Sequence, residues 1–401
     1  MGGMERLLEE IEARGWSGVE KTVCSECVTD YALKAAVREG GGLTPCDYCN
    51  AAPVPPEASA PVDLILDLIV DGFRSEYEDP VEQVAYSSAD GGYQMGLYDV
   101  GDLLMNHEVT EDESLFSDLV AAIEQDAWVQ RDPYAASPKD ALRWGWQAFR
   151  KYVKHRRRYT FLVRDTSPFY GAGDISMDEM PAALADAVET AGQIRVLKAG
   201  TTWWRVRVHS SGEQHQTAAA LGSPPDERAK DNRMTPKGMG AFYGASTPQG
   251  AQAEVAGYAE PTDEGTIGEF ELLRNITVVD LTTVDDVPSL YDSSRRHERA
   301  PIAFMRGFVK DVTRIADPSD HQNLDYIPTQ IVAEYLRYEL AGVAGPVVGV
   351  LWRSSKDPAV ENCVIFATNE EMSDAGASGP ESLLELRPTS VRRIPAPLGK
   401  A

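Results

Sequence analysis

The sequence predicts a multidomain protein that consists of a small cysteine-rich module, an α-helical middle domain and an α+β C-terminal domain. Three observations predict this organisation. Four cysteines cluster near the N-terminus, the next stretch carries apolar residues at helical spacing, and short β-like runs mixed with helical stretches follow from about residue 192. We place the domains at 1–57, 58–190 and 191–401. A chain of 401 residues that is 43% hydrophobic can bury a core in each of them.

The composition excludes some classes of partner. A formal net charge of −25 opposes broad contact with nucleic acid or with an anionic membrane, so nucleic-acid binding is expected only at a local basic patch. No run of about 18 apolar residues predicts a transmembrane helix. The N-terminal stretch MGGMERLLEEIEARGW is acidic and amphipathic, unlike a secretion signal. We therefore expect a soluble, cytoplasmic protein.

The cysteines form two CxxC pairs and one isolated residue. CSEC supplies Cys24 and Cys27, PCDYC supplies Cys46 and Cys49, and eighteen residues separate the inner cysteines. Two such pairs can surround Zn²⁺ with four thiolates, and a segment with few large apolar residues needs the metal to fold. A redox CxxC requires a strand-helix context that is absent here, and four unrelated thiols are the other alternative. We predict a structural zinc site and a buried position for Cys363 in VENCVIFA.

Three segments of the middle domain predict helices after the Pro- and Ala-rich linker AAPVPPEASAPV. They are VDLILDLIVDGFRSEY, DESLFSDLVAAIEQDAW and SPKDALRWGWQAFRKYVKHRRR. Each carries apolar residues near i, i+3 and i+4. Ser137 is the expected N-cap of the third helix, with Pro138 as its first residue.

The third helical segment contains the pattern R-x4-H at Arg150 and His155. This pattern resembles that of HEPN-type ribonucleases, in which a helix presents both side chains to an RNA phosphate. It also arises often by chance, and the basic cluster from Lys154 to Arg158 suits the C-terminal end of a helix dipole. The alternative function is therefore a ribonuclease, or a nucleic-acid or protein sensor, that uses the zinc module and this helix and has a catalytically inactive C-terminal half.

Short β-like runs alternate with helical stretches in the C-terminal domain, which predicts a mixed sheet. Helices are expected at 247–258, 301–315 and 329–341. The β-like runs are IRVLKAG, TTWWRVRVH, GAFYGAS, GTIGEFELL, ITVVDL, VVGVLWRSS and NCVIFA. The sequence contains no GxGxxG motif and no P-loop that would indicate a nucleotide-binding fold of those types.

The run TTWWRVRV alternates in polarity, so Arg205 and Arg207 share one face of the expected strand. The other face carries Trp204, Val206 and Val208. If that apolar face packs on the core, the two arginines point together into a cleft or into solvent.

The stretch from Asp231 to Val255 combines residue types that are typical of a site. It contains Arg233, a turn rich in Pro and Gly, Tyr243, and Glu254 on a helix of small residues. An acid on a closely packed helix is costly unless it is paired or functional. Further along the chain, Ser354 and Ser355 stand at the end of GVLWRSS.

Together these features resemble the RES domain, a bacterial family named for its Arg, Glu and Ser. The resemblance covers about 195–400 and includes an aromatic-Arg pair, a segment of the form GR-x-N-x-x-G, and a Glu eleven residues after a Tyr. These features are met by Trp204-Arg205, NRMTPKG, Tyr243 and Glu254. The chain has Asn232 in place of the Gly that begins this segment in the family, and Arg233 matches the Arg that follows it.

Two further matches extend the resemblance. The family's serine lies eight residues before an Asn, which aligns it with Ser354, given Asn362; Ser355 is the alternative. The segment DYIPTQIVAEYL, with Tyr326, Pro328, Thr329, Gln330 and Glu334, looks like the longer RES variants, where it supports the site. The N-terminal half is similar to the zinc-plus-helical, HEPN-like region that precedes RES in some longer bacterial proteins.

The resemblance implies an ADP-ribosyltransferase-like fold and an NAD⁺-consuming enzyme that acts as a bacterial toxin or defence effector, held in check by an antitoxin. Glu254 would stabilise the oxocarbenium-like cation that forms when the nicotinamide-ribose bond breaks. The other roles implied are phosphate binding by Arg205 and Arg233, stacking by Tyr243, and ribose or amide binding by Ser354 or Ser355. The acceptor stays open among water, phosphate and a protein, and so does self-association.

Overall fold

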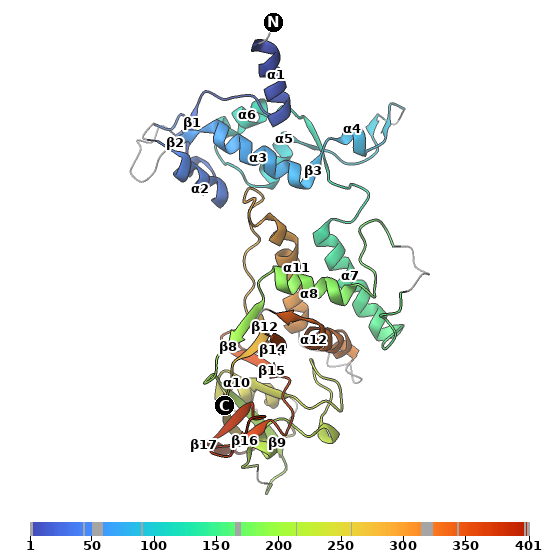
Figure 1. The fold of residues 1–401 in the computed structure, drawn as a ribbon, viewed down its shortest axis with the longest axis vertical. Coiled ribbons are helices and arrows are strands. Elements are labelled where there is room, and N and C mark those ends of the chain that lie inside the picture. The colour runs from blue at the N-terminus through green and yellow to red at the C-terminus, as the bar shows by residue number, and fades with distance from the viewer. Residues whose placement is uncertain are drawn as a thin grey trace. The chain divides into compact units, whose positions relative to one another are not determined.

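The computed structural model describes residues 3–42, 45–49, 59–89, 91–164, 170–213, 215–257, 259–313, 324–342, 345–396 and 398. The chain forms two compact units (Figure 1), which we treat separately. The N-terminal unit consists of Met1–Pro138, Gly171–Gly173 and Val287–Ala300, and the C-terminal unit consists of Lys139–Tyr170, Asp174–Asp286 and Pro301–Ala401. Among the described residues, no helix is both long enough and apolar enough to cross a membrane.

The N-terminal unit is mainly helical and has several very short strands. Its α-helices are α1 (Gly3–Arg14), α2 (Tyr31–Gly40), α3 (Val62–Glu76), α4 (Pro80–Gln83), α5 (Val100–Asn106) and α6 (Glu113–Ala122), with 3-10 turns at Ser25–Cys27 and Arg296–Glu298. Its strands are β1 (Thr22–Cys24), β2 (Ser59–Pro61), β3 (Tyr77–Glu78), β4 (Tyr86–Ser87), β5 (Gly92–Tyr93), β6 (Tyr98–Asp99) and β7 (Ala127–Gln130). The expected helices at VDLILDLIVDGFRSEY and DESLFSDLVAAIEQDAW correspond to α3 and α6, but the second run ends in strand β7 instead of continuing as a helix.

Helix α3 supplies the centre of the N-terminal core. Residues at helical spacing, among them Ile65, Ile69 and Phe73, are fully buried, as the i, i+3, i+4 pattern predicts. Acidic N-caps fix the neighbouring helices: the Asp30 side chain accepts hydrogen bonds from the first turn of α2, and Asp112 does the same for α6. This core explains why the unit forms one body around α3.

A segment from the second half of the sequence, Val287–Ala300, belongs to the N-terminal unit. We call it the inserted segment. Its Leu290 and Tyr291 are buried in the N-terminal core, and Ser289 Oγ donates to Asp30 Oδ1 over 2.9 Å. Arg299 also pairs with Glu76 over 2.9 Å. The inserted segment therefore completes a core whose other parts lie in the first 138 residues.

The boundaries of the two compact units differ from those of the predicted domains at 1–57, 58–190 and 191–401. The cysteine-rich module and the first helices share one core, and residues 139–170 and 174–190 lie in the C-terminal unit. The three ranges stay a prediction of the domain boundaries. The coarser expectation, a multidomain chain with a helical N-terminal region and an α+β C-terminal part, is confirmed.

The C-terminal unit combines a large mixed sheet with helices. Its helices are α7 (Pro138–His155, which starts at the last residue of the other unit), α8 (Met180–Thr190), α9 (Ala218–Leu221), α10 (Pro248–Ala256), α11 (Arg299–Thr313, whose first residues belong to the inserted segment) and α12 (Ile327–Glu339), with 3-10 turns at Asp226–Arg228 and Leu324–Tyr326. Its strands are β8 (Ile194–Leu197), β9 (Thr202–His209), β10 (Phe242–Ala245), β11 (Glu264–Leu272), β12 (Ile276–Leu281), β13 (Ala341–Gly342), β14 (Gly345–Arg353), β15 (Glu361–Ile365), β16 (Met372–Asp374) and β17 (Leu384–Ile394).

The strand order places segments that are distant in sequence side by side. The sheet runs β16-β17-β11-β9-β10-β15-β14-β12-β8, and β13 pairs with β14. The pairs β12-β14 and β16-β17 are parallel, and the other pairs are antiparallel. Strand β10 therefore lies between β9 and β15, which brings the stretch around Tyr243 next to the strands that carry Arg205 and Asn362.

The two faces of the sheet carry separate apolar clusters. Trp203, Phe242 and Phe270 lie in one cluster, and Val206 lies in the other, against which Trp204 and Val208 also pack. This confirms the predicted alternation of β9. Helix α10 covers the second cluster with Ala251 and Val255, and it packs against β9 and β10.

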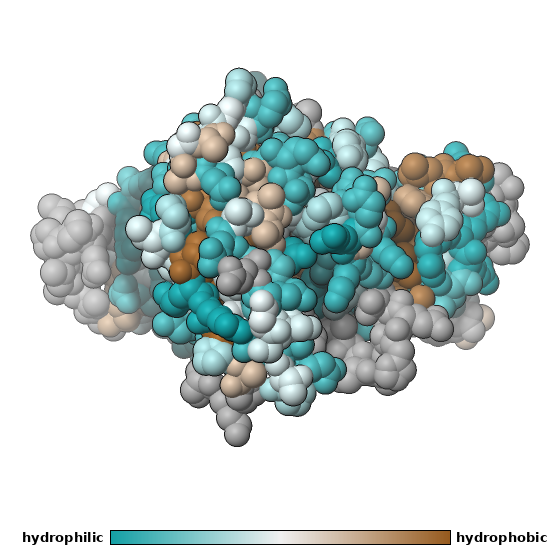
Figure 2. Space-filling view, turned by 90° about the horizontal axis from the view of Figure 1, so that it is seen from below, coloured by the Kyte–Doolittle hydropathy of each residue, from teal (hydrophilic) through white to brown (hydrophobic). Residues whose placement is uncertain are grey.

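The surface agrees with the acidic composition. The face shown in Figure 2 is mainly hydrophilic, and hydrophobic residues appear on it in small separate groups. With a formal net charge of −25, an anionic ligand needs local cationic side chains to hold it.

The first prediction concerns the inserted segment. The Tyr291 ring packs so closely against α3 that a Cβ at Gly72 would lie 2.8 Å from Tyr291 Cδ1, and the buried Tyr291 hydroxyl has no hydrogen-bond partner among the described residues. Tyr291→Ala is expected to lower the free energy of unfolding by about 3 kcal/mol because it opens a cavity. Tyr291→Phe is the matched control: it removes an unsatisfied hydroxyl and should be neutral or stabilising.

Urea unfolding followed by tryptophan fluorescence measures both variants, since the N-terminal core contains Trp16 and Trp128. Equal midpoints for Tyr291→Ala and the parent protein would show that the inserted segment does not contribute to the core.

Candidate functional site

Helix α10 is built from small residues so that it can lie close to the sheet. It begins at Pro248 after Thr247, whose side chain caps the helix by accepting a hydrogen bond from Gly250 N over 3.0 Å. A Cβ at Gly250 would lie 2.4 Å from Val360 Cγ1, so only glycine permits this approach. The close packing sets the position of Glu254 at the last turn of the helix.

The carboxylate of Glu254 is held by two buried polar side chains. Ser354 Oγ donates to Glu254 Oε1 over 2.6 Å, and Asn362 Nδ2 donates to the same oxygen over 2.9 Å. Ser354 and Asn362 are each only 4% exposed. Hydrogen bonds to an ionised acceptor are stronger than neutral ones, so this arrangement fixes the carboxylate on the sheet.

The strand pairing explains why these three side chains meet. Asn362 pairs with Ala245 of β10 on one side and with Trp352 of β14 on the other. Ser354 follows the end of β14, and α10 starts three residues after the end of β10. The site therefore lies where the ends of β14 and β10 and the start of β15 come together.

The structure distinguishes between the two candidate serines. Ser354 is buried and bonded to Glu254, while Ser355 is exposed. The backbone of Lys356 supports this arrangement, because its N–H donates to Ser354 Oγ over 3.2 Å. The Lys356 ammonium donates to Glu254 O over 3.3 Å and also bonds to the carbonyl of Ala253, which ties the serine loop to the end of α10.

Two acceptor atoms in this cluster have no hydrogen-bond partner among the described residues. Glu254 Oε2 makes no hydrogen bond, and the buried Asn362 Oδ1 is also unsatisfied. A buried acceptor without a donor, such as Asn362 Oδ1, is unfavourable by about 1–3 kcal/mol and indicates a place for a ligand or a water molecule; the partly buried Glu254 Oε2 belongs to the same cluster. In the sequence, Asn362 serves only to align Ser354 with the serine of the family pattern. Asn362 is also the polar residue of the otherwise apolar run NCVIFA, and this is the sequence signal that could have assigned it to the site.

Arg233 lies in the same region as Glu254. Its Nη1 donates to Val312 O over 2.6 Å, and its guanidinium carbon lies 5.5 Å from the centre of the Tyr326 ring. Burial lowers the pKa of Arg233, and the charges of Tyr326 and Glu254 act in the opposite direction. Nε and Nη2 of Arg233 make no hydrogen bond to the described residues, so they can bind an anion.

The segment DYIPTQIVAEYL holds the loop that carries Arg233. Thr329 Oγ1 donates to Arg233 O over 2.6 Å. Gln330 Nε2 donates to Asp231 Oδ1 and to Asn232 O of the same loop, each over 2.8 Å. Both side chains are buried at the start of α12. The supporting position expected for this segment is thus present in the fold.

Tyr243 contacts the same loop through its hydroxyl. The hydroxyl lies 2.9 Å from Thr235 Oγ1 and accepts a hydrogen bond from Met234 N over 3.3 Å. Burial raises the pKa of Tyr243 to about 12, so the hydroxyl stays protonated at neutral pH. The loop thus depends on Tyr243 as well as on α12.

Arg205 makes hydrogen bonds within the unit. Its Nε donates to Leu221 O over 3.0 Å, and its Nη1 donates to Tyr243 O over 2.8 Å. These bonds tie β9 to β10 and to the end of α9. Arg205 uses two donor groups in these bonds, and Arg233 uses one.

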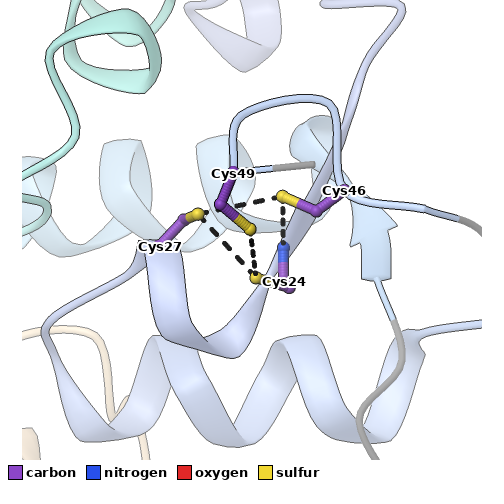
Figure 3. Close-up of side chains that lie close together, drawn as sticks. All are labelled: Cys24, Cys27, Cys46 and Cys49. Atoms are coloured by element: carbon purple, nitrogen blue, oxygen red, sulfur yellow. Dashed lines mark hydrogen bonds between the residues drawn. The ribbon is translucent and has the colours of Figure 1, made fainter. Parts of the chain in front are cut away.

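Four cysteines converge in the N-terminal unit, as Figure 3 shows. The Sγ atoms of Cys24 and Cys27 are 3.7 Å apart, those of Cys24 and Cys49 are 3.6 Å apart, and those of Cys27 and Cys46 are 3.8 Å apart. Tetrahedral Zn²⁺ with Zn–S bonds of about 2.3 Å requires sulfur atoms about 3.8 Å apart. The donor set and its spacing therefore fit zinc. Cys363 is buried in β15, as expected.

Arg150 and His155 have different surroundings on α7. Arg150 Nη1 pairs with Asp311 Oδ2 over 3.0 Å, and Trp146 Nε1 donates to the same oxygen over 3.0 Å. His155 is exposed, five residues further along α7 and about 140° around it. Lys154 pairs with Asp325. Part of the basic cluster thus serves ion pairs inside the C-terminal unit.

Comparison with known families matches both halves of this architecture. A model of the HEPN/RES N-terminal domain 1 matches residues 39–167, and a model of the RES domain matches residues 202–385. The chain is therefore a RES-domain protein with a HEPN/RES N-terminal domain, which confirms the resemblance. RES domains are associated with NAD⁺-consuming toxin and defence systems. No curated protein and no solved structure matches the chain.

The second prediction concerns the cysteine cluster. Cys46→Ser removes one of the four thiolates, and we expect the variant to hold one zinc ion fewer per chain than the parent, measured by elemental analysis of the purified protein. Cys363→Ala is the matched control, because Cys363 lies in β15, and it should keep the zinc content of the parent. Equal zinc content in Cys46→Ser and the parent would exclude the cysteine cluster as a zinc site.

Proposed function

We propose that the C-terminal unit is an NAD⁺-consuming enzyme that cleaves the bond between nicotinamide and ribose. The observation that supports this proposal most directly is the carboxylate of Glu254, held at Oε1 by Ser354 and Asn362 while Oε2 makes no hydrogen bond among the described residues. A fixed carboxylate with one available oxygen suits the stabilisation of a developing positive charge. The association of RES domains with NAD⁺ consumption agrees with this chemistry.

The reaction needs no redox partner. The C1′–N bond of the nicotinamide riboside breaks, and its electron pair moves to the pyridinium nitrogen, which becomes neutral. The ribose is left with an oxocarbenium-like charge, which Glu254 Oε2 stabilises. A nucleophile then forms a bond to C1′ and loses its proton. Water gives ADP-ribose, phosphate gives a phosphorylated product, and a protein side chain gives an ADP-ribosylated protein.

The positions of the neighbouring side chains support distinct roles. We assign the NAD⁺ phosphates to Arg233, because its Nε and Nη2 make no hydrogen bond to the described residues and a guanidinium can bind phosphate with two hydrogen bonds. Asn362 Oδ1 can accept a hydrogen bond from a ribose hydroxyl or from the nicotinamide amide. Tyr243 holds the loop of Arg233 through its hydroxyl, and Arg205 donates a hydrogen bond to the carbonyl of Tyr243.

The proposal includes an ADP-ribosyltransferase-like arrangement of the sheet and a role as a toxin or defence effector. RES domains are linked to toxin–antitoxin pairs. A neutralising protein would have to cover Glu254 and Arg233, and a cationic surface on that partner would suit the acidic chain. The zinc module would have a structural role, because its four thiolates leave zinc no coordination position for a substrate.

The third prediction tests the carboxylate. Glu254→Gln keeps the shape of the side chain but removes its charge, so release of nicotinamide from NAD⁺ is expected to fall by about 10²–10⁴-fold. Chromatographic quantification of nicotinamide measures this rate. Glu260→Gln, an exposed acid six residues further along, is the matched control and should keep the parent rate.

Either of two results would contradict the proposed function. One is that the purified parent protein, free of any inhibitor protein, releases no nicotinamide. The other is that Glu254→Gln releases it as fast as the parent.

The fourth prediction separates the two serines. Ser354→Ala removes a hydrogen bond to the carboxylate and should lower the rate of nicotinamide release by about 10–100-fold, which corresponds to a charge-assisted hydrogen bond of about 1.5–3 kcal/mol. Ser355→Ala changes an exposed neighbour and should leave the rate within about twofold of the parent. If Ser355→Ala were the slower variant, the assignment of Ser354 to the site would be wrong.

A further inference from the structure

A second group of metal-ligand side chains lies in the C-terminal unit, at the end of β9. His209 is the last residue of this strand, and Glu213 and His215 lie on the loop that leads to α9. One potential ligand atom from each of the three residues lies within 4.8 Å of the others. His209 is buried, His215 is partly buried and Glu213 is exposed. Two imidazoles and a carboxylate therefore converge at a place that opens to solvent on one side.

The distances within this group fit a metal ion. Glu213 Oε2 lies 3.2 Å from His215 Nε2, and the two imidazole ring centres are 4.8 Å apart. A tetrahedral site with metal–nitrogen and metal–oxygen bonds of about 2.0–2.1 Å requires neighbouring ligand atoms about 3.3 Å apart. The carboxylate and one imidazole already have this spacing.

The hydrogen bonds of His209 orient it as metal-bound histidines usually are. His209 Nδ1 lies 2.9 Å from Ser210 O, a carbonyl that can only accept, so Nδ1 carries the proton and Nε2 keeps its lone pair. Nε2 lies 2.9 Å from Thr266 Oγ1, and a metal ion at Nε2 would replace this hydrogen bond. A backbone carbonyl that accepts from the second ring nitrogen is the usual support for a histidine ligand.

The simplest alternative is an ion pair between His215 and Glu213. That alternative accounts for two of the three side chains. His209 is held by its own hydrogen bonds to Ser210 O and Thr266 Oγ1, and a metal ion is what would join all three side chains. Arg207 lies on the same face of β9, two residues before His209, and its charge opposes a cation. The carboxylate of Glu213 is the group that offsets this charge, so its presence beside both imidazoles favours the metal site.

We propose that His209, Glu213 and His215 bind a first-row transition metal ion, for which Zn²⁺ is the probe. Imidazole and carboxylate ligands suit Zn²⁺, and three protein ligands leave one position for water on the exposed side. The ion ties the loop after β9 to the sheet. This loop leads into α9, and the Leu221 carbonyl at the end of α9 accepts a hydrogen bond from Arg205. By holding the loop, the metal ion would also hold the start of a helix that contacts Arg205.

The test uses the full chain, depleted of weakly held metal with a chelator and then titrated with Zn²⁺. Zinc per chain is counted by elemental analysis, and the affinity is measured by calorimetry. The parent is expected to bind one zinc ion more than the cysteine cluster holds. Glu213→Gln and His215→Ala should weaken this additional site by more than about 100-fold, since loss of a ligand has a larger effect than the 10–100-fold loss for a supporting hydrogen bond.

Matched controls keep the test decisive. His155→Ala removes an exposed histidine outside the group and should bind as much zinc as the parent. Cys46→Ser should lose the zinc of the cysteine cluster and keep the additional ion. Glu213 is exposed, so Glu213→Gln should fold as the parent does, which thermal unfolding in chelator verifies.

Two results would overturn the proposal. The parent protein could saturate with only the zinc of the cysteine cluster, or Glu213→Gln and His215→Ala could bind the additional ion as tightly as the parent. An anomalous-scattering peak about 2.0–2.2 Å from Glu213 and both histidines would confirm the ligand set directly.

Discussion

The C-terminal unit depends on the position of one carboxylate against the sheet. Glu254 receives hydrogen bonds from Ser354 and Asn362 at a single oxygen, and a partly buried carboxylate is tolerated only with such donors. The close approach of α10, which Gly250 permits, brings the carboxylate within reach of the two donors. The orientation of Glu254 therefore follows from backbone packing and from strand order, and needs no ligand to set it.

The cationic part of the candidate site is fixed by different means. Arg233 stands on a loop that is held by Tyr243 from the sheet and by Thr329 and Gln330 from α12. The Asp231 carboxylate of this loop is bonded to Gln330, and Arg233 forms no ion pair among the described residues. In a chain with a net charge of −25, such a local cation is what an anionic dinucleotide requires.

The N-terminal unit combines a metal-ligand cluster with a core that reaches across the sequence. The four cysteines meet at zinc-like spacing beside a core centred on α3. The inserted segment Val287–Ala300 completes this core, so the fold of the unit depends on residues that follow the first five strands of the large sheet in sequence. A fragment that ends near residue 138 would leave the sites of Leu290 and Tyr291 empty. Contacts this distant in sequence produce no local pattern from which they could be predicted.

Periodicity and turn chemistry predicted most of the larger elements of the fold. The helical spacing in VDLILDLIVDGFRSEY corresponds to α3, and the alternation in TTWWRVRV corresponds to the two faces of β9. The two-residue strands β3 to β6 are too short for any period to reveal them, and β17 was missed because its exposed half, PTSVRR, has no apolar alternation.

Within the candidate site, the residue types predict a set of candidate side chains, but the contacts of each side chain depend on the fold. Glu254 and Ser354 meet as the resemblance suggested, but the contact of Asn362 with Glu254 arises from strand pairing. The carbonyl partners of Arg205 depend on where α9 and β10 end in space. Backbone acceptors carry no sequence signature, so their use by an arginine could not be predicted from the sequence.

The most direct test of the account is the structure of the inactive Glu254→Gln protein with NAD⁺ bound. We predict that the nicotinamide-ribose bond lies beside the side chain at position 254, within hydrogen-bonding distance of Ser354 or Asn362, and that the phosphates contact Arg233. NAD⁺ bound elsewhere on the chain, with its ribose remote from position 254, would contradict the assignment of this site.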